Sequence, residues 1–327
     1  MSFGLGVQEA VGMAVVVLSA LPAAFHANAL AEPPAQVNDN AKTSAGRPAP
    51  LGSLVNVGGY RVHLYCTGKG SPAVVITGAG GSFDWGLVQP ELAKTTRVCA
   101  YDRSGTAWSD PGPPDSCQVR VRELHDALKN GGETGPFVLV GHSLGALVSR
   151  LYAATYAAEV AGMVIVDHAT SFAAPNVSLP VAAPVTPPAA SPGMRVPLGE
   201  DDFKKLPPRE YAMHQWAGSL PGVAEMRRAT PAIMPACSAD VEARTRDQVR
   251  PFGDKPLAVM HTNSGESPGP ASPYAQLQDS LAQLSTNSIK VQADRSSHYM
   301  MLDRPDLVVS TVRRVVEVVR GHARLGR

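Results

Sequence analysis

Short apolar runs alternate with amphipathic stretches along most of the chain. Runs bounded by Gly, Pro or charged residues predict buried strands, and they occur at 73–76, 97–101, 137–140, 163–167, 257–260 and 288–291. Between them, apolar residues recur at helical spacing, at 83–93, 119–129, 147 onward, 274–284 and 306–319. Residues 54–66 add a hairpin-like pair. Strands that alternate with helices predict an α/β fold, in which a mostly parallel central sheet has helices on both faces.

One long segment interrupts this alternation. Between 167 and 256 no apolar run resembles a core strand, and about 80 residues are too many for a simple connection. The segment begins with a Pro- and Ala-rich run at 175–197 and continues with helical stretches at 211–216 and 239–250. The predicted division after residue 50 is a first part of the core at 51–170, an inserted cap at 171–250 and a second part of the core at 251–327.

The N-terminus has the composition of a targeting segment. Residues 11–25 are almost all apolar, a stretch too short to span a bilayer comfortably, and a small-x-small pattern follows at 27–29. This order predicts a signal peptide at 1–29 and a secreted or periplasmic protein, with no stable membrane span after processing. The first residues carry Glu9 and no Lys or Arg, so an uncleaved membrane anchor and a disordered extension are the alternatives. Residues 30–50 are expected to be a flexible linker.

Composition and charge argue against several classes of function. The 327 residues carry a formal net charge of +1, which provides no general attraction to nucleic acid or to a polyacidic partner. No metal site is predicted, because the sequence has neither His-Glu-x-x-His nor cysteines or histidines at ligand spacing. No cofactor is predicted, because the glycine-rich loop at 78–82 matches neither the dinucleotide nor the P-loop pattern. We expect a small-molecule substrate, and the sequence does not indicate an oligomeric state.

A Gly-x-Ser-x-Gly pentapeptide lies at the junction of a predicted strand and a predicted helix. It is Gly-His-Ser-Leu-Gly at 141–145. A sharp turn at such a junction exposes the serine hydroxyl above the sheet, and the flanking glycines allow the backbones to approach closely. We therefore predict that Ser143 is a nucleophile, with a solvated serine in a glycine-rich turn as the alternative. His142, which the turn directs elsewhere, is expected to be structural.

Four landmarks, in order, resemble those of the α/β-hydrolase superfamily. They are the glycine-rich loop at 78–82, Tyr-Asp-Arg-Ser-Gly at 101–105, the pentapeptide at 141–145, and Ser-His at 297–298 before Leu-Asp-Arg-Pro at 302–305. The resemblance covers about 51–170 and 250–320 and implies an α/β-hydrolase fold of the serine esterase or lipase kind. It leaves the cap unassigned, which is where members of the superfamily select substrates. Two departures are a Thr-Gly loop start where His-Gly is commoner, and the lack of an Asp after the strand at 257–260.

The resemblance also implies roles for individual residues. The superfamily order of serine, acid and histidine makes His298 the general base. One oxyanion donor is the N–H of Leu144, directly after the nucleophile, and the other falls at Ala79 in the glycine-rich loop. The resemblance places Cys66 and Cys99 on adjacent strands, which allows a disulfide, although two buried free thiols are the state that we expect.

The carboxylate that orients the base has two candidates. Most superfamily members carry it after the strand at 257–260, where Glu266 is the available acid. The other location is the end of the preceding strand, where Asp167 lies on the carboxyl edge at which such sheets bind ligands. We favour Asp167 over Glu266, with a helix cap or loop anchor as the alternative role of Asp167. Asp102 is expected to be a structural partner of Arg103.

The expected function is that of a serine hydrolase that cleaves carboxylic esters through an acyl-enzyme. An amide, thioester or lactone would use the same residues, so a peptidase or amidase is the main alternative. A non-catalytic binding protein on the same scaffold is a third interpretation. Such a protein would normally have lost a member of the triad, and here the serine and the histidine are both present.

Overall fold

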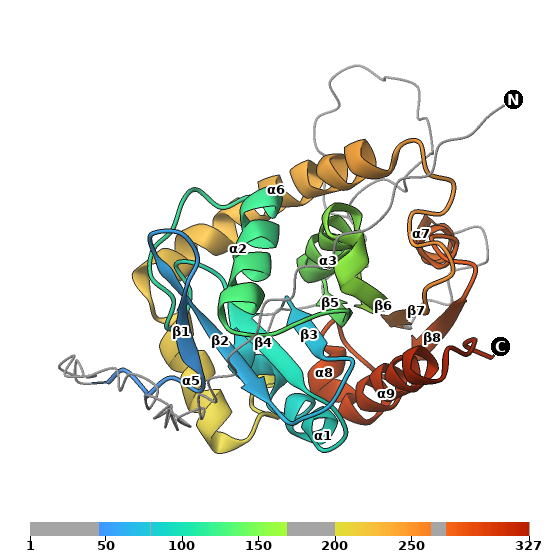
Figure 1. The fold of residues 1–327 in the computed structure, drawn as a ribbon. Coiled ribbons are helices and arrows are strands. Elements are labelled where there is room, and N and C mark those ends of the chain that lie inside the picture. Colours follow the sequence, from blue (N-terminus) through green and yellow to red (C-terminus); the bar gives the residue numbers. More distant parts are fainter. Residues whose placement is uncertain (1–45, 79, 169–199, 263–272, 327) are drawn as a thin grey trace, which may run out of the picture. The chain divides into compact units, whose positions relative to one another are not determined.

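A single eight-stranded sheet organises the chain in a computed structural model that describes residues 46–78, 80–168, 200–262 and 273–326 (Figure 1). The strand order is β1-β2-β4-β3-β5-β6-β7-β8. The pairs β1·β2 and β2·β4 are antiparallel, and all other neighbours are parallel. The strands are β1 (Ser53–Asn56), β2 (Arg61–Thr67), β3 (Val74–Thr77), β4 (Val98–Asp102), β5 (Phe137–His142), β6 (Val160–Val166), β7 (Leu257–Thr262) and β8 (Ser288–Ala293). The predicted α/β fold with a mostly parallel sheet is confirmed.

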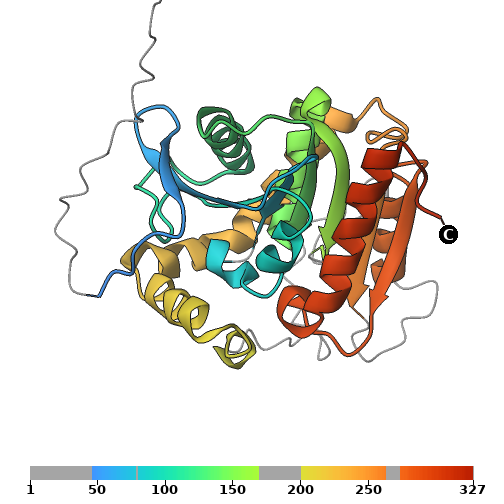
Figure 2. The same ribbon diagram turned by 60° about the horizontal axis from the view of Figure 1, so that its bottom comes forward.

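Helices cover both faces of the sheet (Figures 1 and 2). They are α1 (Gln89–Ala93), α2 (Cys117–Asn130), α3 (Leu144–Thr155), α4 (Glu200–Phe203), α5 (Pro208–Gly218), α6 (Pro221–Thr245), α7 (Pro273–Ala282), α8 (Met300–Asp303) and α9 (Pro305–Gly321), with 3₁₀ turns η1 (Ser82–Trp85) and η2 (Ala157–Glu159). Successive strand residues point to opposite faces, so Leu139 packs with α2 and α3, whereas Val138 and Val140 pack with α1 and α9. This explains why the central strands are apolar at nearly every position.

Two disulfides join elements that are distant in sequence. Cys66 and Cys99 are directly opposite in the antiparallel pair β2·β4 and are bonded to each other. The expectation of two free thiols at these positions is therefore wrong. Cys117, at the start of α2, is bonded to Cys237 of α6. Both partners of this second disulfide are fully buried.

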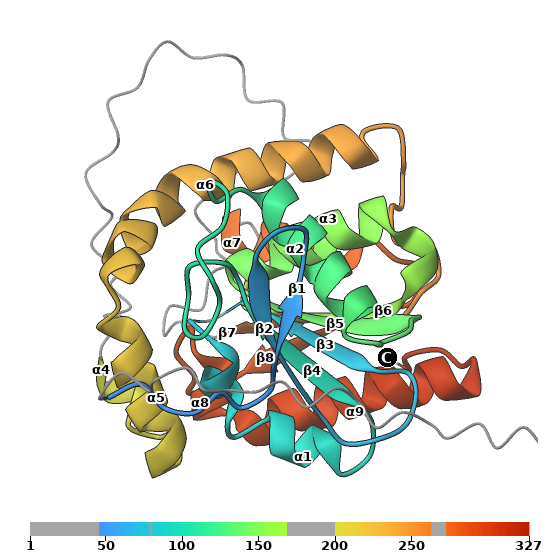
Figure 3. The ribbon, with the colours of Figure 1, turned by 60° about the vertical axis from the view of Figure 1, so that its left-hand side comes forward.

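The segment predicted as an inserted cap contributes α4, α5 and α6 to the described residues, whereas 169–199 lie outside them. The helical stretch expected at 239–250 is helical to Thr245, where the long helix α6 ends. This helix passes Pro235 without ending and curves along one side of the described fold (Figure 3). Met234, Cys237 and Val241 bury the second half of α6 in the core that contains α2 and α3. This half therefore packs on the core helices, whereas Val223 and Met226 of the first half of α6 line the cavity described below.

Residues before the boundary expected at residue 51 also contact the core. The Trp108 indole donates a hydrogen bond to the Pro48 carbonyl at 2.8 Å, and Arg47 donates to the Trp108 carbonyl at 3.1 Å. The last residues of the predicted linker thus pack on the core. The predicted signal peptide lies outside the described residues. Within the described ranges, no helix combines the length and apolar composition that a membrane span needs.

Candidate active site

Ser143 occupies the sharp turn between β5 and α3. Its backbone has φ 55° and ψ −123°, a sparsely populated conformation for a residue with a side chain, at a cost of about 1–3 kcal/mol. Close packing holds the turn in place. The Ser143 N–H donates to the Val166 carbonyl at 3.2 Å. A Cβ on Gly145 would lie 2.4 Å from the Thr77 carbonyl oxygen, so only glycine fits there. The turn therefore places Ser143 at the carboxyl end of β5.

His298, in the loop between β8 and α8, contacts Asp167 at the end of β6. The distance from His298 Nδ1 to Asp167 Oδ2 is 2.6 Å, and both side chains are largely buried. A carboxylate can only accept, so Nδ1 carries the proton and Nε2 keeps its lone pair. The structure thus brings together the two residues that sequence reasoning favoured as base and acid. Glu266, the alternative acid, lies outside the described residues.

The second carboxylate oxygen of Asp167 is held by two donors. Oδ1 accepts from the Tyr274 hydroxyl at 3.2 Å and from the Thr262 N–H at 3.4 Å. The Asp167 backbone has φ 42° and donates its N–H to the Met260 carbonyl at 3.0 Å. Burial and, second, the neighbouring Asp167 raise the pKa of Tyr274, which therefore stays a donor. Contacts from β7 and α7 thus fix the orientation of Asp167.

His142 contacts the backbone and the ring of His298. Its Nε2 donates to the backbone carbonyl of His298 at 2.8 Å, and the two rings lie 4.5 Å apart between centroids. Burial and, second, the nearby His298 keep the pKa of His142 well below its ordinary range. His142 is therefore neutral and carries its proton on Nε2.

Ser143 and His298 line one cavity of about 440 Å³. Among the described residues, Ser143 Oγ has no hydrogen bond to His298, as is common for catalytic groups without substrate. The apolar lining comes from the core and from the helices of the cap segment, and it includes Phe83, Leu144, Val148, Phe203, Ala217 and Met226. Burial raises the pKa of Tyr299, another lining residue, to about 12, so its hydroxyl stays protonated.

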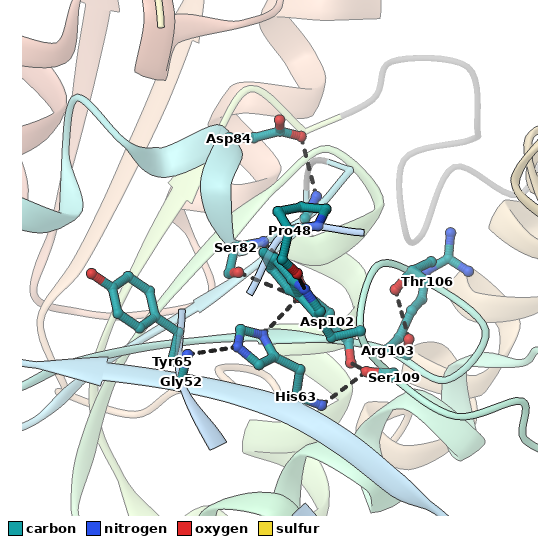
Figure 4. Close-up of polar contacts among 12 residues, drawn as sticks. Pro48, Gly52, His63, Tyr65, Ser82, Asp84, Asp102, Arg103, Thr106 and Ser109 are labelled. Atoms are coloured by element: carbon teal, nitrogen blue, oxygen red, sulfur yellow. Dashed lines mark hydrogen bonds and ion pairs between the residues drawn. The ribbon is translucent and has the colours of Figure 1, made fainter. Parts of the chain in front are cut away.

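The predicted oxyanion donors lie on opposite sides of Ser143 in the sequence. Leu144 is the first residue of α3, so its N–H has no acceptor within the helix. Ala79 lies outside the described residues, but its neighbours do not. The N–H groups of Gly80 and Gly81 donate to Asp84 Oδ2 at 2.7 and 3.1 Å, and the Ser82 N–H donates to Asp102 Oδ1 at 2.6 Å (Figure 4).

Asp102 is structural, but its partner is not the residue expected from the sequence. Its Oδ2 accepts from His63 Nδ1 at 2.8 Å, and both side chains are fully buried (Figure 4). Arg103 instead pairs with Asp115 at 3.0 Å. Within the described ranges, Cys66, Cys99 and Glu133 are the cluster with metal-ligand geometry, and the disulfide leaves that cluster without a thiolate.

Four residues around the site were not predicted from the sequence: His63, Asp84, His214 and Tyr274. Asp84 could have been found, because an acid in the first turn after a glycine-rich loop can accept backbone N–H groups. The histidines had no local signal. His63 is 39 residues from its carboxylate partner, and His214 is 130 residues from Asp84.

Comparisons with known proteins identify the family of the chain. A model of the alpha/beta hydrolase family matches residues 73–311. An AB hydrolase superfamily protein of Gibberella zeae is 25% identical over 289 residues, which are 78% of this chain and 88% of that protein. The 2-hydroxy-6-oxo-6-(2'-aminophenyl)hexa-2,4-dienoic acid hydrolase of Metapseudomonas resinovorans is 33% identical over 130 residues, 35% of this chain and 44% of the relative. An uncharacterised protein of Schizosaccharomyces pombe is 43% identical over 81 residues, 24% of this chain and 15% of that protein. The chain thus spans less than half the length of the last two.

Solved structures share the fold. A thermophilic esterase from Thermogutta terrifontis has a TM-score of 0.55 at 19% identity, with 80% of this chain and 94% of that chain covered. A meta-cleavage product hydrolase from Pseudomonas fluorescens has a TM-score of 0.56 at 17% identity, with 83% and 98% covered. The family match at 73–311 extends over well more than half of the chain and includes the serine turn and the histidine loop. The chain therefore belongs to the alpha/beta hydrolase family.

Proposed function

We propose that the protein is a serine hydrolase that cleaves carboxylic esters through an acyl-enzyme. Ser143 is the nucleophile, His298 the general base and Asp167 the acid that orients it. The observation that carries this proposal is the 2.6 Å contact between His298 Nδ1 and Asp167, beside a cavity that Ser143 also lines. Family membership supports the coarser statement that the protein is a hydrolase.

Acylation begins when Ser143 Oγ attacks the ester carbonyl carbon. A serine hydroxyl is a weak nucleophile at neutral pH, so its proton must pass to a base as the new C–O bond forms. His298 Nε2 accepts that proton, since Nδ1 already carries one for Asp167. The imidazolium that results is stabilised by the Asp167 carboxylate, which stays ionised.

Charge then develops on the former carbonyl oxygen. The free N–H of Leu144 at the start of α3 is the first donor to this oxyanion, and the N–H of Ala79 is the second. Loss of one such donor typically reduces turnover by about 10²–10³. The start of a helix is a favourable place for the charge, because its N–H groups and dipole both point toward it.

The intermediate collapses when the C–O bond to the alcohol breaks and His298 returns its proton to the leaving oxygen. The product alcohol departs, and the acyl group remains on Ser143. A water molecule then attacks the acyl carbon while His298 again takes a proton. A second collapse releases the carboxylic acid and restores the serine hydroxyl, so each turnover consumes one water.

We also propose that the protein is exported. Two disulfides lie within the described residues, and three of their four cysteines are fully buried. Such bonds persist in oxidising compartments and are rare in the cytosol. This supports the targeting segment expected at 1–29.

Chromogenic p-nitrophenyl esters of increasing acyl length test the proposed reaction. The wild-type protein should turn over at least one of them and should be labelled by a fluorophosphonate on the peptide that contains Ser143. Ser143→Ala should lose both properties while it unfolds at the wild-type temperature. A folded wild-type protein with neither turnover nor labelling would overturn the proposal.

A further inference from the structure

Asp84 holds the loop that precedes it. Its carboxylate is fully buried, and its Oδ2 accepts from the N–H groups of Gly80 and Gly81 at 2.7 and 3.1 Å. The next N–H, that of Ser82, donates to Asp102. Three successive amides after Ala79 are therefore fixed by two carboxylates, and Figure 4 shows the one at Ser82 beside Asp102. Ala79, the proposed oxyanion donor, directly precedes these three residues in the sequence.

The other oxygen of Asp84 is bound by a residue of the cap segment. His214 of α5 places its Nδ1 2.7 Å from Asp84 Oδ1, and its side chain is only 10% exposed. Its ring stacks on Phe203 of α4, with centroids 3.7 Å apart and planes at 15°. A histidine between a carboxylate and a stacked ring has little rotational freedom. His214 of α5 is thus coupled to the glycine-rich loop, at Gly80 and Gly81, through the carboxylate of Asp84.

Apolar packing brings α5 to the same place. Phe83 of η1 forms a buried cluster with Trp108 and with Met213 and Ala217 of α5. A Cβ on Gly81 would lie 2.4 Å from the Phe83 ring, so the loop passes directly against this ring. The loop therefore contacts α5 through a hydrogen-bonded pair and through an aromatic contact.

Among the described residues, the side-chain partners of the second carboxylate lie in the core and in the loop itself. Asp102 is held by His63 of β2, and His63 Nε2 accepts from the Gly52 N–H at 2.8 Å (Figure 4). Both nitrogens of His63 are thus satisfied within the core. The loop has one anchor in the sheet and one that depends on the position of α5.

We propose that His214 and Asp84 are positioning residues, which make the oxyanion geometry depend on how α5 is seated. Neither residue reacts: Asp84 orients the loop, and His214 orients Asp84. Displacement of α5 from η1 would remove the His214 donor from Asp84, so the carboxylate that binds Gly80 and Gly81 would be less firmly oriented. This inference rests on the proposed ester hydrolysis, since it assigns the same loop to the same reaction.

The test removes the donor of His214 and then restores it. His214→Leu cannot donate, whereas an Asn side chain can place an amide N–H near the position of Nδ1, so His214→Asn is the rescue variant. His125→Leu is the matched control, because His125 of α2 is also a part-buried histidine that contacts carboxylates, Asp126 and Glu159, and its ring stacks on Tyr156. Turnover is normalised to the folded fraction from circular dichroism and to the serine labelled by fluorophosphonate at the end point.

We expect His214→Leu to lower kcat about 10- to 100-fold with KM nearly unchanged, because a misplaced donor loses part of what a missing donor loses. A trifluoromethyl ketone, which forms an oxyanion on Ser143, should bind weaker by the same factor, and the matching methyl ketone should bind as before. His214→Asn should recover most of the kcat, and His125→Leu should match the wild type. A purely structural role would lower the unfolding temperature without separating the two ketones.

Amide hydrogen exchange gives a readout that does not need turnover. In His214→Leu and Asp84→Ala, peptides that cover 78–85 should exchange faster, while peptides from β5 should not change. Equal exchange, together with an unchanged affinity for the trifluoromethyl ketone in an active wild-type background, would overturn the inference alone. Failure of the wild type to turn over esters or to label would overturn the proposed function and this inference with it.

Discussion

Asp167→Asn changes one atom of the proposed triad, and the structure determines how that atom will lie. Tyr274 and Thr262 both donate to Oδ1, so an asparagine will keep its amide oxygen there. Its NH₂ group then faces His298 Nδ1, which must give up its proton to accept this donor. The proton moves to Nε2, and the imidazole can no longer take a proton from Ser143.

The expected fall in kcat follows from the free-energy cost of turning the asparagine amide around. Flipping the amide sacrifices the bond from the Thr262 N–H and opposes donor to donor there, while the Tyr274 hydroxyl can turn to the Thr262 carbonyl at 3.2 Å. The flip costs about 1–3 kcal/mol, or roughly a 5- to 150-fold loss of the competent tautomer. The variant also lacks the negative charge that stabilises the imidazolium. Together we expect kcat to fall about 10⁴-fold, the loss seen when an orienting aspartate is neutralised without a change in geometry.

The assay is steady-state hydrolysis of the best p-nitrophenyl ester, with thermal unfolding to verify that Asp167→Asn is folded. Glu266→Gln is the matched control, and it should stay within a few-fold of wild type. Tyr274→Phe should have a small effect alone but should raise the activity of Asp167→Asn several-fold, because it removes one donor that fixes the amide. A fall in kcat of less than about tenfold in Asp167→Asn would refute the reasoning. A large fall in kcat in Glu266→Gln would instead indicate that Glu266 orients His298.

Three further predictions concern the stability of the fold. Replacing Cys117 and Cys237 by serine opens a loop with a sequence separation of 120; urea unfolding should show a loss of about 5 kcal/mol, and a loss below about 1 kcal/mol would contradict the loop-entropy argument. His142 is neutral when folded and has a lowered pKa, so the unfolded chain binds the extra proton below pH 6.5 and stability falls with acid. Between pH 7 and 5.5, the free energy of unfolding of His142→Gln should fall by about 1.2 kcal/mol less than that of the wild type. Equal falls in the two proteins would exclude His142 as the source of the pH dependence. Gly145→Ala places a Cβ 2.4 Å from the last carbonyl oxygen of β3 and should cost at least about 3 kcal/mol, whereas Gly222→Ala, with 3.9 Å of clearance, should cost little by the same urea measurement.

The central sheet could be predicted because its signal is local. Strands such as β5 and β6 are buried on both faces, so they are apolar at nearly every position and bounded by turns. The strand-to-helix turn at Ser143 also has a local signal, since Gly141 and Gly145 flank the serine within five residues. Where neighbouring residues decide a structure, the sequence alone is sufficient.

The structure of the segment after β6 was harder to predict, because it depends on contacts between residues that are distant in sequence. Proline has a low helix propensity, so the prolines within α6 locally favour an interruption of the helix. Burial of Met234 and Val241 against the core and the bond from Cys237 to α2 nevertheless hold α6 as one helix. Local propensity therefore lost to tertiary packing.

Contacts between residues distant in sequence also distinguish three histidine–aspartate pairs that the sequence could not tell apart. In each, an Nδ1 lies 2.6–2.8 Å from a carboxylate: His298 with Asp167, His63 with Asp102, and His214 with Asp84. What differs is the surroundings of the rest of the ring. His63 has its Nε2 occupied by a backbone N–H, and His214 is stacked on an aromatic ring, whereas His298 shares a cavity with Ser143. The carboxylate sets the tautomer in every case, but the group beside the other nitrogen decides whether the imidazole can act as a base.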